Sequence, residues 1–475
     1  MQWARQSHGK AAGGLALHTI FVVHAVLAGL ALLWLVVHAL LQWRRERASA
    51  QIVRLLGGDE HEPDTLHPVI DGNLCIGSAA CVRACPEDKA LVVVDGRARL
   101  ADPGGCVGHG ACRLACPVDA IELVFGSARR GVDLPMLTTE FQSSQPGIYI
   151  AGELGGMGLV ANAVRQGVKA VEEIEASLAA EGTGPGPGPG AGAGADVLPL
   201  LIIGAGPAGL GATLAARARG LASRTLEREA SMGGSVRAYP RGKIVMTHPV
   251  ELPLYGHVRL RRTRKETLIE LWDDVLRQSG VSIEFGRKLE GIERDGATLL
   301  ARIEGEAAPV RARRVLLATG RRGRPRRLGV PGEAQAHVHD RLEDPAAHDG
   351  QACVVVGGGD SAIEAALALA ERPGTRVVLS YRGERFVRAK PETRRRLEDA
   401  VAAGRVRVLC GSQVAEVAGD TVTLALAAGE REVVPAQVLF TLIGRDLEHG
   451  LLAAAGIEVR TFHGEGPRSR PTRPR

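Results

Sequence analysis

The stretch LPLLIIGAGPAG at residues 198–209 decides the architecture of this chain, because an apolar run leads directly into a glycine-rich turn. The run is typical of a buried strand, and the alanine-rich residues after the turn favour a helix. Gly204, Gly206 and Gly209 complete the pattern G-x-G-x-x-G. In this pattern Gly204 makes the turn, Gly206 admits a pyrophosphate, and Gly209 packs the helix on the strand. The stretch therefore predicts a dinucleotide-binding unit.

An acidic residue at the end of the next predicted strand strengthens this prediction. Glu227 follows Gly209 by 18 residues. A carboxylate in that place accepts a hydrogen bond from the adenosine ribose of a bound dinucleotide. We therefore expect Glu227 to bind the cofactor together with the glycine loop.

A second glycine loop lies 153 residues after the first. Gly357, Gly359 and Ala362 form G-x-G-x-x-A directly after the apolar residues 354–356, and a predicted helix follows. A repeat of the strand–turn–helix pattern predicts a second dinucleotide-binding domain.

The strand after the second loop indicates which nicotinamide cofactor is bound. Residues 376–380 lead into Tyr381-Arg382 rather than into an acidic residue, and Arg388 follows closely. A carboxylate would repel a 2′-phosphate, whereas a guanidinium group can bind it, so NADPH is preferred to NADH. The alternative is that Arg382 and Arg388 only cover the surface.

Four motifs together resemble the thioredoxin-reductase-like flavoproteins, over residues 197–460. They are the first glycine loop, Ala-Thr-Gly at 318–320, Val-Pro-Gly-Glu at 330–333, and the second glycine loop with its continuation to residue 364. The resemblance implies that the first loop holds FAD. It also implies that the second loop holds the nicotinamide cofactor, which passes hydride to the flavin.

The chain departs from the thioredoxin reductases in its cysteines. Those enzymes carry a C-x-x-C shortly before the second glycine loop, but residues 335–350 contain no cysteine here. Cys353 and Cys410 stand singly in apolar segments, so we expect both in buried strands. A dithiol relay is therefore absent.

The other six cysteines form an internal duplication. Cys75-x5-Cys81-x3-Cys85-Pro is repeated 31 residues later as Cys106-x5-Cys112-x3-Cys116-Pro. The runs resemble those of two-cluster bacterial ferredoxins, over residues 67–126. The resemblance implies that Cys75, Cys81 and Cys116 hold one cluster, and that Cys106, Cys112 and Cys85 hold the other.

Each run lacks the second cysteine of the ferredoxin pattern, and Ser78 and His109 stand in its place. Three readings are open: these side chains ligate iron, the clusters have three irons, or one iron keeps an exchangeable ligand. Zinc is less well supported, because neither run contains the C-x2-C pair of structural zinc sites. The sequence thus predicts two iron–sulfur clusters, 4Fe-4S or 3Fe-4S, with Ser78 and His109 as candidate ligands.

The N-terminus predicts a membrane anchor. Residues 15–41 contain no Asp, Glu, Lys or Arg and are long enough to span the bilayer, and they are too long for the apolar part of a secretory signal. More arginines follow this segment than precede it, which places the later domains in the cytoplasm. We expect a single-pass protein of the inner (cytoplasmic) membrane that contacts lipid through this helix. His24 and His38 share a face of the helix, and haem binding there stays open.

A piece of the flavin domain lies in an unusual place. Related flavoproteins end in a segment like T-x-V-P-G-I-Y-A-x-G-D, whose acid contacts FAD. Residues 141–153 have this form and end in Gly152-Glu153, and a predicted helix follows at 161–178. We infer a circular permutation, with Gly152 and Glu153 binding FAD; the alternative is an independent extension of the ferredoxin. The order also resembles membrane-anchored bacterial ferredoxin–flavoprotein fusions, whose Gly-Glu-Leu-Gly-Gly-Met-Gly run matches residues 152–158.

The expected fold class is α/β: two Rossmann-like FAD- and NAD(P)-binding domains, a small α+β two-cluster ferredoxin domain and one N-terminal transmembrane helix. The predicted segments are an N-terminal segment (1–14), the transmembrane helix (15–41), a juxtamembrane linker (42–66), the ferredoxin-like domain (67–126), a displaced C-terminal piece of the FAD domain (127–181), a Gly/Pro linker (182–195), the FAD domain (196–325), the NAD(P) domain (326–435), a return to the FAD domain (436–463) and a disordered tail (464–475).

Composition agrees with several folded domains. The chain has 475 residues, a net charge of +6 and 45% hydrophobic residues, which excludes wholesale disorder. Only 3% of the residues are aromatic and no recognition motif is present, so we expect no nucleic-acid partner.

These features predict an NAD(P)H-dependent oxidoreductase that passes electrons between NADPH, FAD and the clusters to or from a partner. A quinone, a cytochrome or a soluble carrier is the expected class of partner, and a homodimer is left open. The alternatives are a reductase of a small disulfide, as in bacillithiol-disulfide-reductase-like relatives, and a redox-sensing membrane protein. No catalytic acid or base is assigned. Lys243, Tyr255 and Lys265 lie either near the flavin or in solvent.

Overall fold

The computed structural model describes residues 4–56, 66–87, 90–103, 106, 108, 110–128, 131–156, 158–182, 197–321, 323–387, 389–427, 429–446 and 449–466. His109 and Arg388 lie outside these residues, as do residues 183–195 of the predicted linker and residues 467–475 of the predicted tail.

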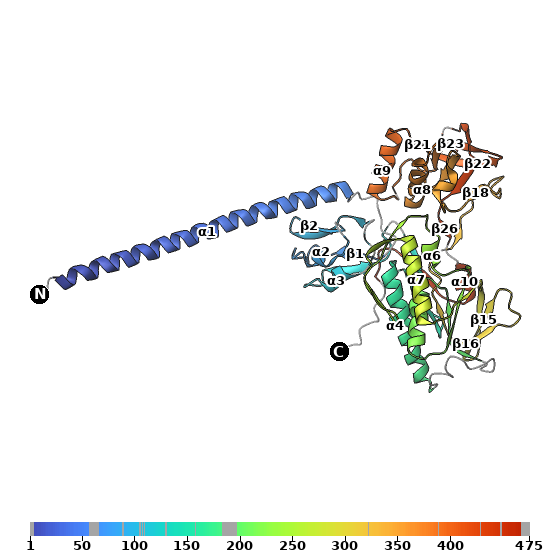
Figure 1. Cartoon of the computed structure of the whole chain (residues 1–475), viewed down its shortest axis with the longest axis horizontal. Coiled ribbons are helices and arrows are strands. Elements are labelled where there is room, and N and C mark those ends of the chain that lie inside the picture. Colours follow the sequence, from blue (N-terminus) through green and yellow to red (C-terminus); the bar gives the residue numbers. More distant parts are fainter. Residues whose placement is uncertain are drawn as a thin grey trace.

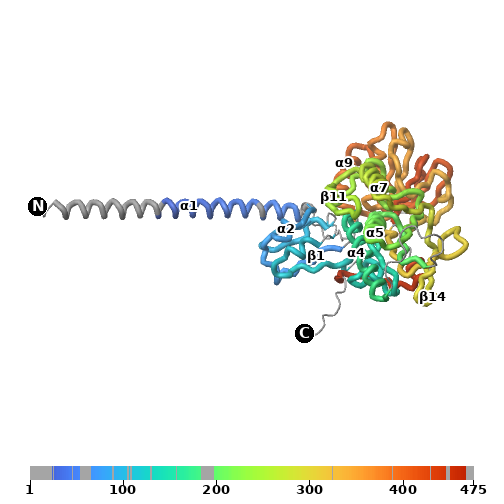
Figure 2. The backbone as a smooth tube through the Cα atoms, turned by 60° about the horizontal axis from the view of Figure 1, so that its bottom comes forward, coloured from blue at the N-terminus to red at the C-terminus, as the bar shows by residue number. Residues whose placement is uncertain are grey.

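A long helix, α1 (Ala4–Leu56), projects from the body of the molecule (Figures 1 and 2). The segment Val26–Val53 contains an apolar stretch that is long enough to cross a membrane, and the rest of the molecule buries none of that stretch. The helix continues past residue 41, where a linker was predicted. Residues 42–56 contain no glycine or proline, so nothing in them ends the helix.

The cysteine module, residues 66–128, lies beside the end of α1 (Figure 1). Its elements are β1 (His67–Ile70), α2 (Ala80–Ala84), β2 (Leu91–Val94), β3 (Arg97–Leu100), α3 (Ala111–Leu114) and β4 (Ile121–Val124). β1 pairs with β4 and β2 with β3, both antiparallel. Cys81 and Cys112 are buried in one small core with apolar residues of β2, β3 and β4. The duplicated sequence therefore folds as one unit.

The FAD domain is built on a sheet with the strand order β13-β8-β7-β16-β15-β14. Its strands are β7 (Leu198–Ile203), β8 (Ser223–Glu227), β13 (Glu284–Phe285), β14 (Leu289–Asp295), β15 (Thr298–Ile303) and β16 (Val310–Leu317). β7, β8, β13 and β16 run parallel, and β14 and β15 form an antiparallel extension. The helix α5 (Pro207–Ala218) follows β7.

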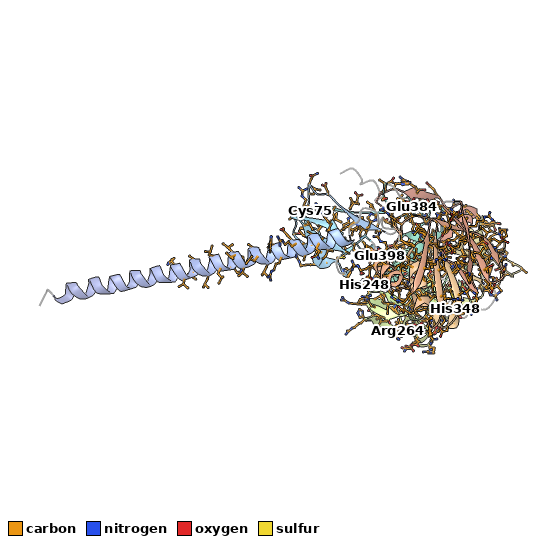
Figure 3. All side chains as sticks on the ribbon, turned by 90° about the horizontal axis from the view of Figure 1, so that it is seen from above. Cys75, His248, Arg264, His348, Glu384 and Glu398 are labelled. Carbon is orange, nitrogen blue, oxygen red and sulfur yellow. The ribbon has the colours of Figure 1, made fainter. Side chains whose placement is uncertain are left out.

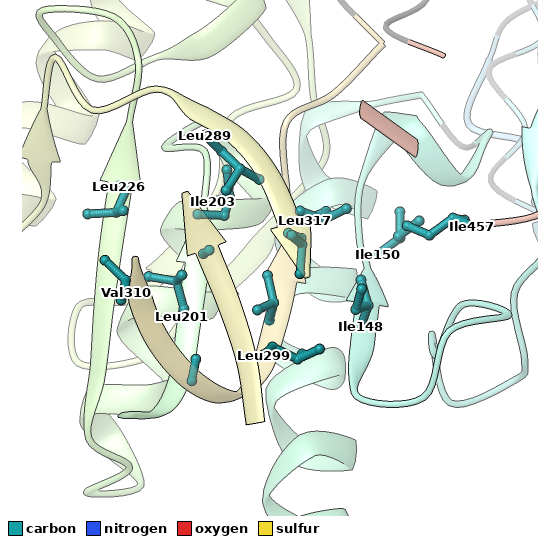
Figure 4. Packing of buried hydrophobic residues seen from close by; sticks show 14 of the residues in the cluster. Ile148, Ile150, Leu201, Ile203, Leu226, Leu289, Leu299, Val310, Leu317 and Ile457 are labelled. Atoms are coloured by element: carbon teal, nitrogen blue, oxygen red, sulfur yellow. The ribbon is translucent and has the colours of Figure 1, made fainter. Parts of the chain in front are cut away.

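The segment between the cysteine module and the linker adds to this sheet. β6 (Ile148–Ile150) runs parallel to β16 and pairs with its last residues. Ile148 and Ile150 pack in the same core as Leu201, Ile203 and Leu317 (Figure 4). The helix α4 (Val160–Ala180) lies tightly against α5. A Cβ at Gly167 would come within 2.0 Å of a backbone oxygen of α5, so only glycine permits this approach.

The NAD(P) domain has a parallel sheet with the strand order β18-β25-β19-β20-β21. Its elements are β18 (Val338–His339), η3 (Pro345–His348), β19 (Ala352–Val356), α8 (Asp360–Ala370), β20 (Arg376–Tyr381), α9 (Pro391–Ala402), β21 (Val406–Cys410), the antiparallel β22 (Ser412–Ala418), β23 (Thr421–Leu426) and β24 (Arg431–Pro435), and β25 (Val438–Thr441). The chain was predicted to leave this domain at residue 436. The structure differs, because β25 pairs with β18 and β19 inside it.

Two short pairings join the parts of the molecule. β17 (Arg324–Pro325) and β26 (Arg445–Asp446) connect the two dinucleotide-binding domains. β5 (Val132–Pro135) pairs with β27 (Val459–Phe462), and Phe125 exchanges backbone hydrogen bonds with Gly464 and Glu465. Residues 464–465, predicted as disordered tail, therefore hold the cysteine module against the FAD domain.

The remaining elements surround the FAD sheet. They are η2 (Glu153–Gly155), α6 (Gly234–Arg237), β9 (Ile244–Met246), β10 (Val250–Leu252), β11 (Gly256–Val258), β12 (Arg262–Arg264), α7 (Lys265–Ser279) and α10 (His449–Ala454). β9 pairs with β12 and β10 with β11. Residues 239–268 form an insert in the FAD domain, which carries Lys243 and His248 toward the other parts of the molecule.

Candidate functional site

The first glycine loop has the three expected glycine environments. Gly204 has φ +104°, and a Cβ there would lie 2.6 Å from the oxygen of Ala318. A Cβ at Gly209 would lie 1.8 Å from the oxygen of Gly204. A Cβ at Gly206 would meet nothing within 4 Å. Gly204 and Gly209 thus serve the turn and the helix packing, while Gly206 faces open space where a pyrophosphate would lie.

Glu227 ends β8 beside this loop and is 5% exposed. Its carboxylate accepts hydrogen bonds from the backbone N–H of Ala205 at 2.6 Å and of Glu229 at 2.9 Å. The loop and the acidic residue therefore hold each other in place at the edge where a ribose would bind.

A cavity of about 580 Å³ lies at the carboxyl ends of β6, β7 and β16. Gly152 and Glu153 after β6, Gly206 after β7 and Thr319 after β16 all line it, together with Glu227. Ligands of parallel α/β sheets bind in this position. The sequence-predicted residues of the first loop, of β8 and of the upstream segment thus meet around one cavity.

The turn after β6 is fixed by α4. The backbone N–H of Gly152 donates to Gln166 Oε1 at 2.7 Å, and Gly152 has φ +86°. The Glu153 side chain is exposed to the cavity. Protein atoms around the cavity displace water from it and raise the pKa of its carboxyl, while Arg321 acts in the opposite direction.

The residues present fit a dinucleotide such as FAD, because Gly206 lines the cavity with open space beside it and so leaves room for a pyrophosphate. Sequence reasoning missed Gly234, Arg321 and Leu451, which also line the cavity. Two consecutive glycines at 233 and 234 could have indicated a special backbone conformation, because glycine adopts positive φ more easily than other residues. Both glycines have positive φ in the structure. Arg321 and Leu451 approach the site only through the fold and had no local signal.

Side chains of the NAD(P) domain reach the same cavity. Lys243 Nζ lies 2.5 Å from Glu364 Oε2 of α8, and both residues line the cavity. Of the other two residues considered in the insert, Tyr255 donates to Asp274 at 2.9 Å and Lys265 to the oxygen of Tyr239 at 2.5 Å. Only Lys243 of these three lines this cavity.

The second glycine loop is built in the same way. Gly357 has φ +148°, and a Cβ there would lie 2.3 Å from the oxygen of Leu442. A Cβ at Gly359 would meet nothing within 4 Å, and Ala362 is fully buried in the helix that follows. The loop therefore presents Gly359 as its open position.

Of the two predicted phosphate-binding arginines, Arg382 does not line the cavity. Arg382 is exposed just after β20, and Arg388 lies outside the described residues. Tyr381 instead lies against the loop: a Cβ at Gly358 would come within 2.0 Å of its ring, which stacks on Phe386 at 5.0 Å. Cys353 is buried as expected, but Cys410 is exposed, because it ends the edge strand β21.

The six cysteines of the module fall into two groups of three. Cys75, Cys81 and Cys116 line one small cavity together with Ser78. In the second group, burial raises the pKa of Cys106 to about 11, and the neighbouring thiols of Cys112 and Cys85 add to the rise. The ferredoxin resemblance implies these same two sets of three as cluster ligands, and this assignment stays a prediction.

Backbone N–H groups orient two thiols of the first group. Ala98 N–H donates to Cys75 Sγ at 3.4 Å, and Ala120 N–H donates to Cys116 Sγ at 3.3 Å. Ser78 Oγ accepts from the N–H of Ala80 at 3.4 Å. Such N–H donors stabilise thiolate ligands and tune the potential of a cluster.

Burial also affects the protonation of three other thiols of the module. It raises the pKa of Cys81, Cys85 and Cys112, so bound iron has to displace their protons. A zinc ion would gather its thiolates at about 2.3 Å from one centre. Among the side chains that the structure describes, no three His, Cys, Asp or Glu converge in that way.

Two family models match the chain. Residues 201–464, more than half of the chain, match the pyridine nucleotide-disulphide oxidoreductase model. Residues 67–117 match a 4Fe-4S dicluster domain.

Individual relatives match about half of this chain. The ferredoxin–NADP reductase of Gluconacetobacter diazotrophicus is 32% identical over 272 residues, which cover 54% of this chain and 75% of that protein. Bacilliredoxin reductase of Bacillus subtilis is 25% identical over 266 residues, covering 54% and 80%. Among solved structures, a bacillithiol disulfide reductase from Staphylococcus aureus aligns with a TM-score of 0.49 at 22% identity, covering 55% and 80%.

Proposed function

The chain belongs to the pyridine nucleotide-disulphide oxidoreductase family and is an NAD(P)H-dependent flavin oxidoreductase, and from this premise we propose that it passes electrons between NADPH, FAD and two iron–sulfur clusters to or from a redox partner. One observation carries the proposal: a single cavity is lined by Gly206 and Glu227 of the FAD domain and by Glu364 of the NAD(P) domain. A 4Fe-4S dicluster domain in the same chain supplies the route for the electrons.

Bound FAD takes up a hydride from the nicotinamide and can release its electrons singly to iron–sulfur clusters. The residues of this chain bind and orient these groups. With FAD bound, Gly206 would admit the pyrophosphate, Glu227 would accept a hydrogen bond from the ribose, and Glu153, which lines the same cavity, would contact the cofactor. Ser361 and Glu364, in the first turns of α8, stand at the entrance for the nicotinamide.

The flavin domain is circularly permuted in this proposal. β6 and α4 serve as its last strand and helix, although they precede β7 in the chain. Three contacts support this: the parallel pairing of β6 with β16, the packing of α4 on α5, and the position of Glu153 in the cavity. The cysteine module is then tethered directly to the segment that covers the flavin.

NADPH is the proposed electron donor rather than NADH. Arg382 after β20 stands where an acidic residue would select NADH, and the ferredoxin–NADP reductases among the relatives carry the same cofactor in their name. Arg388, six residues later, is the second proposed phosphate ligand.

The protein is proposed to be anchored in the cytoplasmic membrane through α1, with its other domains in the cytoplasm. The segment Val26–Val53 supports this by its length and composition. Arg44 and Arg47 follow the apolar part, as the positive-inside rule requires on the cytoplasmic side. A quinone, a cytochrome or a soluble carrier at the membrane surface is the proposed class of partner, and self-association as a homodimer is compatible with a single anchoring helix.

The proposal is tested by NADPH oxidation with a one-electron acceptor such as cytochrome c. The wild-type protein should turn over steadily, which a sensor would not do. A variant with Cys75→Ala and Cys106→Ala should keep flavin reduction by NADPH but lose most acceptor reduction. Undiminished acceptor reduction in that variant would refute the route through the clusters and favour the disulfide reductase, which gives the cysteine module no role.

A further inference from the structure

The second cysteine group is in contact with the FAD domain through a pair of side chains. His248 Nε2 lies 3.5 Å from Glu87 Oε1, and the two side chains are 18% and 12% exposed. Glu87 follows Cys85 by two residues. Figure 3 labels His248 at the side of the FAD domain that faces the cysteine module. The loop of Cys85 therefore touches the insert of the FAD domain.

The same insert leads to the flavin cavity. Val245 in β9 lines the cavity, and His248 follows it by three residues. Three residues of extended chain span at most about 10 Å. A short stretch of backbone thus joins the wall of the cavity to the contact with Glu87.

A second, independent row of contacts leads to the same cysteine group. Gly156, in the turn after Glu153, lies so close to the ring of Phe125 that a Cβ there would come within 2.7 Å of it. Phe125 packs with Leu66, and a Cβ at Gly108 would lie 2.4 Å from the oxygen of Leu66. Gly108 follows Cys106 by two residues. The first row of contacts ends two residues from Cys85, and the second ends two residues from Cys106. Both cysteines belong to the second cysteine group.

The first cysteine group lies toward α1 instead. Cys75 accepts a hydrogen bond from β3, and a Cβ at Gly77 would meet the β2–β3 turn at 2.1 Å. Ala50, Ile52 and Val53 of α1 pack on Val92 and Val94 of the same hairpin.

This group is also open to a partner. Ile76, the neighbour of Cys75, is 65% exposed, and Leu74 on its other side is 53% exposed. The loop that carries Cys75 therefore lies at the surface of the module.

We propose that the two cysteine groups act in a fixed order. Cys85, Cys106 and Cys112 exchange electrons with the flavin, and Cys75, Cys81 and Cys116 exchange them with the partner beside the end of α1. His248 is a positioning residue that holds the second cysteine group, through Glu87, against the FAD domain. This order adds the sequence of electron transfer to the proposed function, and it rests on that function.

The electrons balance along this route. One NADPH becomes NADP⁺ by giving a hydride, which is two electrons and one proton, to the flavin, and a second proton comes from solvent. The two electrons then leave one at a time through the Cys85 group and the Cys75 group to two equivalents of a one-electron acceptor. Both protons return to solvent, and the reverse flow reduces NADP⁺.

The order is tested with Cys75→Ala and Cys106→Ala in the full-length protein. Iron analysis and electron paramagnetic resonance of the dithionite-reduced protein identify the cluster that each variant retains. The reduced protein is then mixed with NADP⁺ and freeze-quenched. The retained cluster should reoxidise at nearly the wild-type rate in Cys75→Ala and about 100-fold more slowly in Cys106→Ala. Equal rates, or the opposite pattern, would overturn the order.

His248→Ala tests the order without changing a cysteine that binds a cluster. It is the decisive variant if one of the cysteine variants retains no cluster. Electron exchange between flavin and clusters should slow about tenfold, while hydride transfer from NADPH to flavin, the resonance spectra and the melting temperature stay unchanged. His248→Gln should recover most of the rate. His257→Ala is the matched control, because His257 contacts Glu251 at 3.2 Å in the same insert. An unchanged rate in His248→Ala would overturn the proposal.

The wild-type protein distinguishes a failure of the proposed function from a failure of the proposed order. If its clusters exchange no electrons with the NADPH/NADP⁺ couple, the proposed function is wrong and the order falls with it. If they do exchange electrons but the exchange is lost in Cys75→Ala and kept in Cys106→Ala, only the order is wrong.

Discussion

The ammonium of Lys243 lies 2.5 Å from the carboxylate of Glu364, so an ion pair joins the FAD domain to the NAD(P) domain at the wall of the flavin cavity. The two side chains are 32% and 38% exposed. Ion pairs with this exposure contribute at most about 1 kcal/mol. The contact is therefore weak enough to open in each cycle.

Removing this ion pair should ease entry of the nicotinamide. In Glu364→Gln, the rate of flavin reduction at saturating NADPH should rise about two- to fivefold, because the lost attraction is about 1 kcal/mol or less. Stopped-flow absorbance of the flavin measures this rate. Glu432→Gln is the control, since it breaks the Arg407–Glu432 pair, also 2.5 Å long, away from the cavity. A slower reduction in Glu364→Gln would show that the pair instead helps to align the cofactors.

Two glycines of the first loop should respond differently to the same substitution. Gly206→Ala should leave the melting temperature of the flavin-free protein almost unchanged but abolish FAD retention, because its methyl group enters the cofactor space. Gly209→Ala should destabilise the fold itself by about 1–3 kcal/mol, because its methyl group would overlap the oxygen of Gly204. The flavin content and thermal unfolding of both variants check this. Retained FAD in Gly206→Ala would contradict the assignment of the cavity.

The raised pKa of Glu153 predicts a pH-dependent effect in the flavin-free protein. Protein atoms around the cavity displace water from this carboxyl and raise its pKa above the value of 4.5 expected in the unfolded chain, so folding favours the protonated form. The stability that this group contributes is fully present below the unfolded pKa and is lost as the pH rises through the folded pKa. Glu153→Gln should therefore become progressively more stable than wild type above about pH 4.5. A difference in melting temperature that does not vary with pH would contradict this.

Two truncations should separate anchoring from folding. Removing residues 1–43 should release the protein from membranes and keep its clusters. Removing residues 1–56 should also weaken the cysteine module by about 1–3 kcal/mol, because Ile52 and Val53 no longer cover β2. Membrane fractionation and the decay of the cluster absorbance measure the two effects. Membrane attachment that survives the shorter truncation would contradict the role of α1.

The local parts of the fold could be predicted from the sequence. The strand expected at 376–380 is β20, and both glycine loops open the helices expected after them. These features depend on neighbouring residues: an apolar run, a positive φ that only glycine adopts easily, and a helix that follows at once. The crossed grouping of the cysteines needed the ferredoxin resemblance, because spacing within one run does not show which run completes which cluster.

The rest depended on contacts between distant segments. The return from the NAD(P) domain was placed too early, because the apolar strand Val438–Thr441 would suit either parallel sheet. Cys410 was expected to be buried, but its strand lies at the sheet edge. The pairing of Lys243 with Glu364 joins residues 121 positions apart, and no local pattern indicates such a contact.

The central claim is a connected path from NADPH through the flavin to the clusters. An anaerobic NADPH titration of the detergent-purified, full-length protein tests it directly, with visible absorbance for the flavin and low-temperature electron paramagnetic resonance for the clusters. We predict that the flavin bleaches and that signals of reduced clusters grow in step with it. The claim would be contradicted if the flavin bleached while the clusters stayed oxidised throughout. This result counts only if dithionite reduces the clusters and NADP⁺ does not reoxidise them afterwards.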